Sequence, residues 1–592
     1  MCFKILFYFN FSPAYEDPPG IDSDLEDEEN YSNSESEDDQ EARLPRKWTK
    51  ESNQQQFIPP DSVFDNSNRR FNRHIDQLDS GSTHFKILRT FIDSQIVSEI
   101  LEQTNLRAKQ LQRANPRTIP SWTDLNEDEL WVFIGLHLMT GIIKKPRLRD
   151  YWSTNVNFQT PGFSKHTSRN KFESILRCLH FSNNENPPEG SDRLWKLGKI
   201  LPRLLRNFDG CINPGGYLCV DERLMAYKGR LSFLQYNPRK RSRFGIKYFA
   251  LVDCETKFLV NTIVYLGKKT KIDPKKKQAC GIGGAIVIEL LKGYMGKKHK
   301  VVVDNWFNSP KLQEYLAARK TFYLGTVRPN RKDMPKMTNK LPKGAVESYV
   351  SNELLYEKWS DRRQVNMLNS FMPRKMEYVP SFNPNNNREN PTSVVRYNKT
   401  MGGVDYIDQI LSPYKAERKT IRWYKKFFFH LLDLSVYNSF VLFKNLNPSK
   451  RVVYLDFLEA LITEIFVENK VKRKIGRPLR AVDWRPMENL ATQTAMCVNG
   501  AENAKQPYSS AVRVTRNFAL EVEALNPATQ SSTGMRILTP TWIKLLPMIL
   551  KLKFQLPRNQ MTPNPNRYCK NLNHDRPFKS QSQSLLASQK DY

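Results

Sequence analysis

The order of strand-like and helix-like segments between residues 217 and 327 constrains the fold of this chain more than any other feature. Residues 217–220 are rich in β-favouring side chains, and residues 243–252 and 257–266 predict a hairpin that turns around residues 254–256. The pattern then predicts a helix, an apolar strand, a second helix and a further strand, at residues 283–294, 301–304, 310–318 and 322–327. Strands and helices that alternate in this way favour a mixed α/β sheet with flanking helices.

Three strands followed by helix, strand, helix and strand is the order of elements in an RNase H-like fold. In that fold, a carboxylate in the first strand and another just after the fourth strand come together at the centre of the sheet. Asp221 and Asp304 occupy these two positions. An aspartate at a strand end is also an ordinary turn or helix-capping residue, so the strand order predicts a shared site without proving it.

The segment at residues 401–409 reads M-G-G-V-D-Y-I-D-Q and supplies two further acids, Asp405 and Asp408. Their spacing puts both carboxylates on one face of a helix. Two like charges held together favour either a hard divalent cation or the N-terminus of a helix, which stabilises acids in its first turn. The position of this helix after the last predicted strand suits the third acid of the same site.

The stretch between the last predicted strand and Asp405 is longer than an RNase H-like core requires. Residues 329–392 are therefore expected to form an insertion, with strands at 345–358 and 363–370 between basic ends that are rich in Pro and Asn. An insertion at this place would be suited to pack over bound DNA.

Helical periodicity surrounds this predicted core. Asn126 can cap a helix at residues 126–143 whose apolar face includes His137, which we interpret as a core or boundary histidine rather than a ligand. Two further helices are expected at 168–180 and 192–208. Residues 427–443 are apolar but are interrupted by polar side chains, so they predict a buried helix and no span of a membrane.

The charge of the chain favours a polyanionic partner. It carries 92 Lys and Arg against 61 Asp and Glu, and residues 16–41 hold thirteen of the acids and no base. Nucleic acid is the usual partner of a basic body with an acidic tail, although a basic balance alone fits many ribosomal, chromatin and membrane-surface proteins equally well. The candidate DNA contacts are Arg239, Lys240, Arg241, Lys268, Lys269, Lys275, Lys276, Lys277, Arg418, Lys419, Arg422 and Trp423. Trp423 is a candidate for stacking on an unpaired base, with packing in a helical core as the alternative.

The cysteines point to neither a disulfide framework nor a zinc module. All eight are scattered without a C-x-x-C pair, which is typical of reduced, intracellular thiols. The N-terminus imitates a signal peptide only weakly, because its apolar run is very short and an acidic tract follows it.

Several longer motifs resemble the piggyBac-type transposases, and they span about residues 130–446. The matching stretches are S-R-N-K-F-E-S-I-L-R-C-L-H-F-S (168–182), D-R-L-W-K-L (192–197), V-D-E-R-L-M-A-Y-K-G-R (220–230), F-G-I-K (244–247), V-D-N-W-F-N-S (303–309), L-G-T-V-R-P-N-R (324–331), Y-N-K-T-M-G-G-V-D-Y-I-D-Q (397–409), R-K-T-I-R-W (418–423) and H-L-L-D (430–433). The resemblance implies that Asp221, Asp304 and Asp405 match the family's catalytic aspartates and that Asp408 is a supporting acid.

The resemblance also implies a chemistry and a setting. Asp221 would bridge two Mg²⁺ (or Mn²⁺) ions, with Asp304 on one ion and Asp405 on the other, since hard oxygen ligands suit these metals. The implied activity is nicking of double-stranded DNA at transposon ends, formation of hairpins and joining to a T-T-A-A target, by a homodimer in the nucleus. The basic run at 470–478 is a candidate nuclear-localisation signal.

The predicted organisation is an RNase H-like α/β core with an insertion, embedded in an all-α DNA-binding and dimerisation domain between disordered tails. The expected segments are an acidic tail (1–82), a helical domain in two parts (83–215 and 415–470), the core in two parts (216–328 and 393–414), the insertion (329–392) and a basic tail (471–592). The family's C-terminal zinc module is not expected here, because only Cys497 and Cys569 follow residue 470. Intact acids favour an active transposase, whereas this tail favours a domesticated or decayed nuclear DNA-binding relative; a nuclease of another RNase H-like family is a third alternative.

Overall fold

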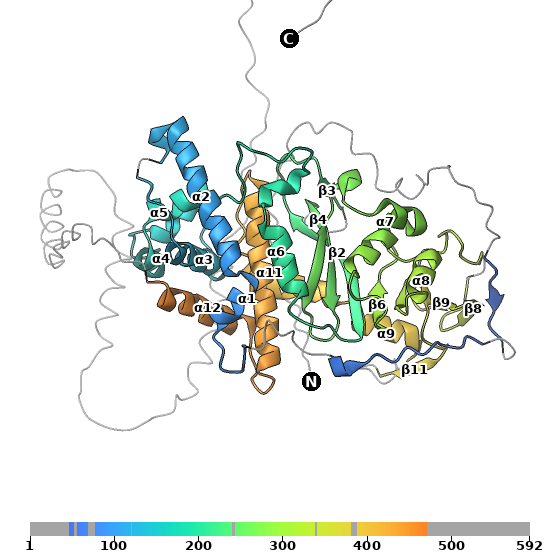
Figure 1. Cartoon of the computed structure of the whole chain (residues 1–592). Helices are drawn as coiled ribbons and strands as arrows, with labels where there is room; N and C mark the ends of the chain where they lie inside the picture. The colour runs from blue at the N-terminus through green and yellow to red at the C-terminus, as the bar shows by residue number, and fades with distance from the viewer. Residues whose placement is uncertain are drawn as a thin grey trace, which may run out of the picture. The chain divides into compact units, whose positions relative to one another are not determined.

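The computed structural model describes residues 46–52, 56–68, 77–119, 121–238, 243–337, 340–380 and 388–470 (Figure 1). The described residues belong to one compact unit that ends at Gly476. The predictions for residues 1–45 and for the tail at 471–592 lie outside the described residues. Among the described residues, no helix is both long enough and apolar enough to cross a membrane.

A mixed sheet forms the centre of the α/β part. Its middle strands lie in the order β5-β4-β2-β6-β7 and have the bounds Leu259–Val264, Phe244–Asp253, Tyr217–Ala226, Lys300–Val303 and Phe322–Thr326. β2 is antiparallel to β4 and parallel to β6, and β6 is parallel to β7. The predicted succession of elements is confirmed, since helix α7 (Pro274–Leu290) precedes β6 and helix α8 (Pro310–Ala317) follows it.

One strand boundary differs from the prediction, and one strand was not predicted. β2 continues to Ala226 because it stays paired with β4 as far as Gly245, so Asp221 lies in the middle of the strand and not at its end. The edge of β4 also pairs with a short strand, β3 (Leu234–Tyr236), which the sequence pattern did not predict. Pairing with a neighbour thus lengthened one strand and created another.

The segment predicted as an insertion extends the same sheet. β8 (Val346–Ser351), β9 (Leu354–Ser360) and β10 (Gln364–Asn369) form an antiparallel series, and β10 pairs with β7. The single strand predicted at 345–358 is instead a hairpin that turns at Asn352, whose φ of 51° lies in the left-handed region that Asn tolerates. The short strand β1 (Thr49–Lys50) pairs with β8 at the outer edge, and Phe57 is buried. The prediction of a disordered tail through residue 82 was therefore wrong for this segment.

A two-stranded ribbon leads from this sheet to the helix that carries the last two acids. β11 (Met376–Val379) pairs with β12 (Arg388–Pro391), and α9 (Thr392–Thr400) follows directly. α10 (Gly403–Leu411) is next, and it contains Asp405 and Asp408.

Helices from both ends of the described chain pack together beside the sheet (Figure 1). They are α1 (His84–Phe91), α2 (Ser94–Ala114), α3 (Glu127–Ile142), α4 (Pro161–His166), α5 (Arg169–Cys178), α6 (Ile200–Asp209), α11 (Trp423–Leu446) and α12 (Tyr454–Glu468). Glu464 of α12 accepts hydrogen bonds from the backbone N–H of Phe85 and pairs with the His84 ring at 2.6 Å, which ties the two ends to each other. One apolar cluster includes residues of these helices and of β2 and β4, so the core is continuous across the boundary predicted at residues 215 and 216. The predicted division into domains stays a prediction.

Local signals predicted the starts of these helices well and their environment less well. Asn126 accepts from the backbone N–H of Glu129 at 2.9 Å, so the predicted cap of α3 is confirmed. The prediction of a single apolar face was wrong, because α3 is buried on all sides from Leu130 to Leu138. The helix predicted at 192–208 is interrupted at Gly198, where φ is 56° and an added Cβ would lie 1.9 Å from the carbonyl oxygen of Phe181.

α11 is the buried helix that the sequence predicted at residues 427–443. Two of its polar side chains, Asn438 and His430, bond partners in the sheet, which explains why they interrupt an apolar run. Asn438 bonds both backbone groups of Leu259 in β5, at 3.0 and 2.9 Å, and His430 bonds the Tyr248 hydroxyl at 2.6 Å. α11 therefore connects the helical part of the unit to the sheet.

Candidate active site

Two of the predicted acids lie on neighbouring strands. Val220 of β2 and Val303 of β6 are paired in parallel register, and Asp221 and Asp304 directly follow them. Tyr397 of α9 lies near both acids: burial raises the pKa of its phenol, and the charges of Asp304 and Asp221 raise that pKa further. The sequence did not single out Tyr397, although it opens the motif at residues 397–409.

Asp304 is held at the end of β6 by its own backbone. Its Oδ1 accepts from the N–H of Trp306 at 2.9 Å. Burial raises the pKa of the Asp304 carboxyl, and the charge of Glu222 adds to this effect, while the backbone amide of Trp306 opposes it. The Trp306 ring stacks on Phe249 with 5.3 Å between ring centres.

Asp405 and Asp408 have different surroundings although both lie on α10. Asp405 is exposed in the first turn of the helix. Asp408 accepts a hydrogen bond from Nη2 of Arg223 at 2.5 Å, and the Arg223 side chain is only 1% exposed. Burial alone would raise the pKa of Asp408, but the charge and hydrogen bond of Arg223 outweigh burial and lower that pKa. Asp408 is thus bound to a buried cation of the strand that carries Asp221.

The start of α10 is also fastened to β2. The Cys219 thiol donates to the carbonyl oxygen of Met401 at 3.1 Å. Gly403 lies so close to the sheet that an added Cβ would be 3.2 Å from Val252 and 3.6 Å from Cys219. Since side chains of a strand alternate between its faces, Cys219, Asp221 and Arg223 belong to one face of β2. α10 lies on that face.

The donor chemistry of the three predicted ligands fits a divalent cation, because carboxylate oxygens are the ligands that Mg²⁺ and Mn²⁺ favour. Within the part of the chain that the structure describes, no three side chains of His, Cys, Asp or Glu gather closely enough to hold a metal ion. The fold therefore brings Asp221 and Asp304 to adjacent strands and α10 to β2. The metal-binding triad itself stays a prediction.

The predicted DNA contacts fall into three places. Arg239, Lys240 and Arg241 lie outside the described residues. Lys268 and Lys269 are exposed in a short turn after β5, and Lys275, Lys276 and Lys277 lie in the first turn of α7. Lys276 pairs with Glu289 at 2.8 Å. Contact with DNA stays a prediction for all of them.

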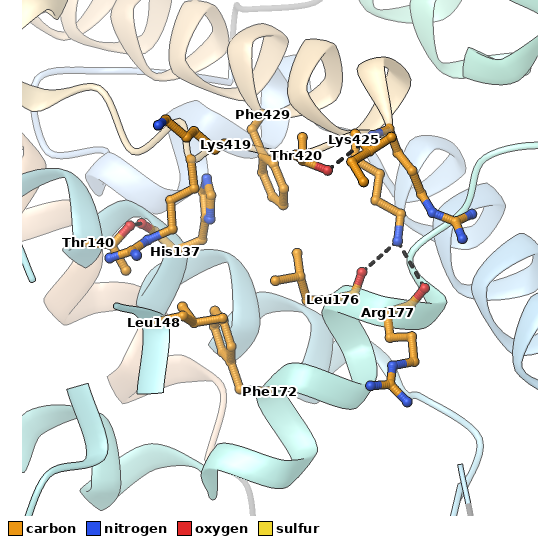
Figure 2. Close-up of a pocket in the computed structure, with 13 residues that line it drawn as sticks. His137, Thr140, Leu148, Phe172, Leu176, Arg177, Lys419, Thr420, Lys425 and Phe429 are labelled. Atoms are coloured by element: carbon orange, nitrogen blue, oxygen red, sulfur yellow. Dashed lines mark hydrogen bonds between the residues drawn. The ribbon is translucent and has the colours of Figure 1, made fainter. Parts of the chain in front are cut away.

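Arg418, Lys419 and Arg422 line a pocket of about 300 Å³ together with Lys425, and Figure 2 shows its wall. The apolar part of the lining includes Leu148, Phe172, Leu176 and Phe429. The predicted core histidine, His137, also lines the pocket and stacks on Phe429 with 3.7 Å between ring centres.

Trp423 follows this pocket in sequence but faces the core. It is 8% exposed and meets Phe233 edge-to-face with 5.3 Å between ring centres. The packing alternative is thus the one that the structure shows, and stacking on a base stays a prediction that would require the ring to leave this contact.

The burial of Lys425 predicts that the free energy of unfolding depends on pH. Its Nζ donates to the carbonyl oxygens of Leu176 and Arg177 at 2.6 and 2.9 Å (Figure 2). Burial, helped by the charge of Arg422, lowers the Lys425 pKa to about 7. The unfolded chain keeps an ordinary lysine pKa of about 10.4, so it binds more protons than the folded chain above pH 7, and stability rises with pH in that window.

From pH 7 to pH 9, the free energy of unfolding of the unmodified chain should rise by on the order of 1 to 2 kcal/mol more than that of Lys425→Met. Denaturant unfolding at several pH values measures this difference. Lys268→Met, which removes an exposed lysine, should keep the slope of the unmodified chain. Equal slopes for the chain and Lys425→Met would contradict the prediction.

Comparisons with known proteins agree with the motifs. Residues 84–440 match the family model described as Transposase IS4. Human PiggyBac transposable element-derived protein 2 is 23% identical over 452 residues, which cover 72% of this chain and 74% of that protein. Human PiggyBac transposable element-derived protein 3 is 24% identical over 397 residues, 64% of each chain, so this chain spans somewhat less than two thirds of that relative.

A solved structure with the piggyBac name is also similar to this chain. One chain of the cryo-EM structure of the piggyBac transposase synaptic complex with hairpin DNA matches with a TM-score of 0.60 and 25% identity, over 76% of this chain and 92% of that chain. The family match covers more than half of the chain, and the curated and structural relatives carry the piggyBac name. This chain belongs to the piggyBac-type transposase family.

Proposed function

We propose that this chain is a metal-dependent DNA transposase that cuts transposon ends and joins them to T-T-A-A target sites. The observation that carries the proposal is the placement of Asp221 and Asp304 beside each other on β2 and β6, with α10 fastened to the same face of β2. The sheet order around these strands is the one expected of an RNase H-like core. The solved relative is titled as a complex with hairpin DNA, which supports double-stranded DNA as the substrate.

The acids have distinct roles in this proposal. Asp221 would bridge two Mg²⁺ or Mn²⁺ ions, Asp304 would bind one of them and Asp405 the other. When bound, such ions neutralise phosphate charge and lower the pKa of an attacking water or hydroxyl. The protein's own contribution is to orient three carboxylates on a rigid sheet and helix, with Asp408 supporting α10.

The basic side chains would position the substrate. Arg418, Lys419 and Arg422 at the pocket and the exposed lysines around residues 268–277 would contact phosphates, which adds affinity without reading sequence. A homodimer that holds two transposon ends in the nucleus is the setting that the family suggests. The basic run at 470–478 is the candidate localisation signal.

A second candidate is a transposase-derived DNA-binding protein without transposition. It is favoured by the names of the human relatives, which are transposable element-derived proteins, and by the two cysteines that follow residue 470. Both candidates predict DNA binding, so binding does not distinguish them.

Excision of a T-T-A-A-flanked donor decides between them. The full chain is incubated with the donor DNA in Mg²⁺ and, separately, in EDTA, and strand cleavage is read on a denaturing gel. We expect cleavage only with Mg²⁺. Binding to DNA in a gel-shift assay without Mg²⁺-dependent cleavage would favour the second candidate.

A further inference from the structure

We propose that Arg223 is a positioning residue of this site: through Asp408 it holds α10, and Asp405 with it, on the face of β2 that carries Asp221. The proposal rests on the proposed metal-dependent function, and it concerns a residue that binds no metal itself. Arg223 follows Asp221 by two residues on the same face of β2. Asp408 follows Asp405 by three residues on α10.

The burial of Arg223 is costly for the folded state. Its side chain is 1% exposed, and among the described residues its Nε and Nη1 have no hydrogen-bond partner. A buried charge that satisfies only part of its hydrogen-bonding capacity contributes little to stability, and apolar residues in its place often do better. The pair with Asp408 therefore has a reason beyond stability, and the placement of α10 supplies one.

Two contacts locate α10 along β2, one on each side of Asp221. The first is at Cys219, where the thiol meets Met401 and Gly403 packs closely. The second is the bond from Arg223 to Asp408. At about 3.3 Å per residue in a strand, these anchors stand roughly 13 Å apart, and Asp405 lies between their partners on α10. Val404, Ile407 and Leu411 of α10 are buried as well, so loss of the second anchor would shift the helix on β2 rather than release it.

Arg223 is the fixed partner of this pair. Its guanidinium lies 5.5 Å from the centre of the Tyr248 ring on the neighbouring strand β4. The Tyr248 hydroxyl bonds Nε2 of His430 at 2.6 Å, and Nδ1 of His430 bonds Glu417 at 3.0 Å. Since these groups belong to the sheet, to α11 and to the segment before it, Arg223 is held from the core side. The position of Asp408, and of α10 with it, is therefore set by Arg223.

The test measures Mn²⁺ affinity and thermal stability in variants of Arg223 and Asp408. Arg223→Met, Asp408→Leu and the double variant are made in the full chain, and Mn²⁺ binding is measured by isothermal titration calorimetry beside thermal unfolding. Each single variant should lower Tm, and the double variant should regain most of the loss because no unpaired charge remains. Mn²⁺ affinity should fall about 10- to 100-fold in all three, since supporting contacts typically tune affinity by that factor.

The Mn²⁺ affinity of the double variant distinguishes a positioning role from a purely structural one. If the double variant regains Mn²⁺ affinity together with Tm, the pair is only structural and the proposal is overturned. Arg223→Lys keeps the positive charge and is the variant to use if the apolar variants fail to fold. A lysine ammonium lacks the planar guanidinium group of Arg, so the Mn²⁺ affinity of this variant should also fall. Mn²⁺ affinity equal to that of the unmodified chain in Arg223→Lys would overturn the proposal as well.

A matched control comes from another ion pair. Arg203 of α6 pairs with Asp93, the N-cap of α2, at 2.7 Å, and Arg203→Met should lower Tm without changing Mn²⁺ affinity. A chain that binds Mn²⁺ in an Arg223-dependent way but cleaves no DNA would contradict the proposed function and support the role of Arg223. A chain that binds no Mn²⁺ would overturn both.

Discussion

Asp304→Asn is expected to reduce strand cleavage at a T-T-A-A-flanked end at least about a thousandfold, a loss of ~4 kcal/mol in transition-state stabilisation. Asparagine has nearly the same shape but carries no charge, and a hard divalent cation needs anionic oxygen ligands. The backbone of the site should survive, because the amide oxygen of Asn can still accept from the N–H of Trp306. Single-turnover cleavage on a denaturing gel measures the effect.

DNA binding gives the internal control for this variant. The dissociation constant of Asp304→Asn for transposon-end DNA in EDTA should stay close to that of the unmodified chain, since the basic contacts are untouched. Asp128→Asn is a matched substitution away from the site, at an exposed position in the first turn of α3. It should cleave normally. Cleavage by Asp304→Asn within tenfold of the unmodified chain would remove Asp304 from the proposed site.

Asn438→Leu is expected to lower the free energy of unfolding by about 3 kcal/mol. Asn438 is fully buried in α11, and its amide both donates to the carbonyl oxygen of Leu259 and accepts from the N–H of Leu259. Leucine has a similar size but neither a donor nor an acceptor, so it takes the partner away from both backbone groups of β5. Urea unfolding followed by circular dichroism measures the loss.

The neighbouring serine is the control for that effect. Ser439 is equally buried, but its hydroxyl donates to the carbonyl oxygen of Ser435 within the same helix. Ser439→Ala should cost less than about 1 kcal/mol, because that carbonyl keeps its helical bond. If the two substitutions cost the same, the link between α11 and β5 is not what makes Asn438 important.

Local sequence patterns predicted the elements of the fold with their order. Helix caps such as Asn126 and apolar strands such as residues 301–303 are recognisable because their signals lie within a few residues of the element. The errors arose where the environment is supplied from far away in the chain. β2 is longer than predicted because β4 continues to pair with it, and α3 is apolar on all sides because other helices surround it.

The segment at 329–392 is a larger example of an error that arose because the environment comes from a distant part of the chain. Its two strand-rich stretches were visible in the sequence, but nothing local indicated that β10 would pair with β7 and extend the central sheet. Strand pairing depends on which edge is open when the segment arrives, and this is a property of the folded sheet.

The motifs and the order of elements in the sequence were enough to predict the family and the α/β core, and they nominated Asp221, Asp304 and Asp405 as its acids. The motifs gave Asp405 and Asp408 different expected roles, but the partner of Asp408 became visible only in the folded chain, where the buried Arg223 meets it across 185 positions. The spacing on a helix can show that two acids share a face. Which partner each acid meets depends on how that helix packs on β2, because a contact between distant residues is decided by the packing of the elements that carry them.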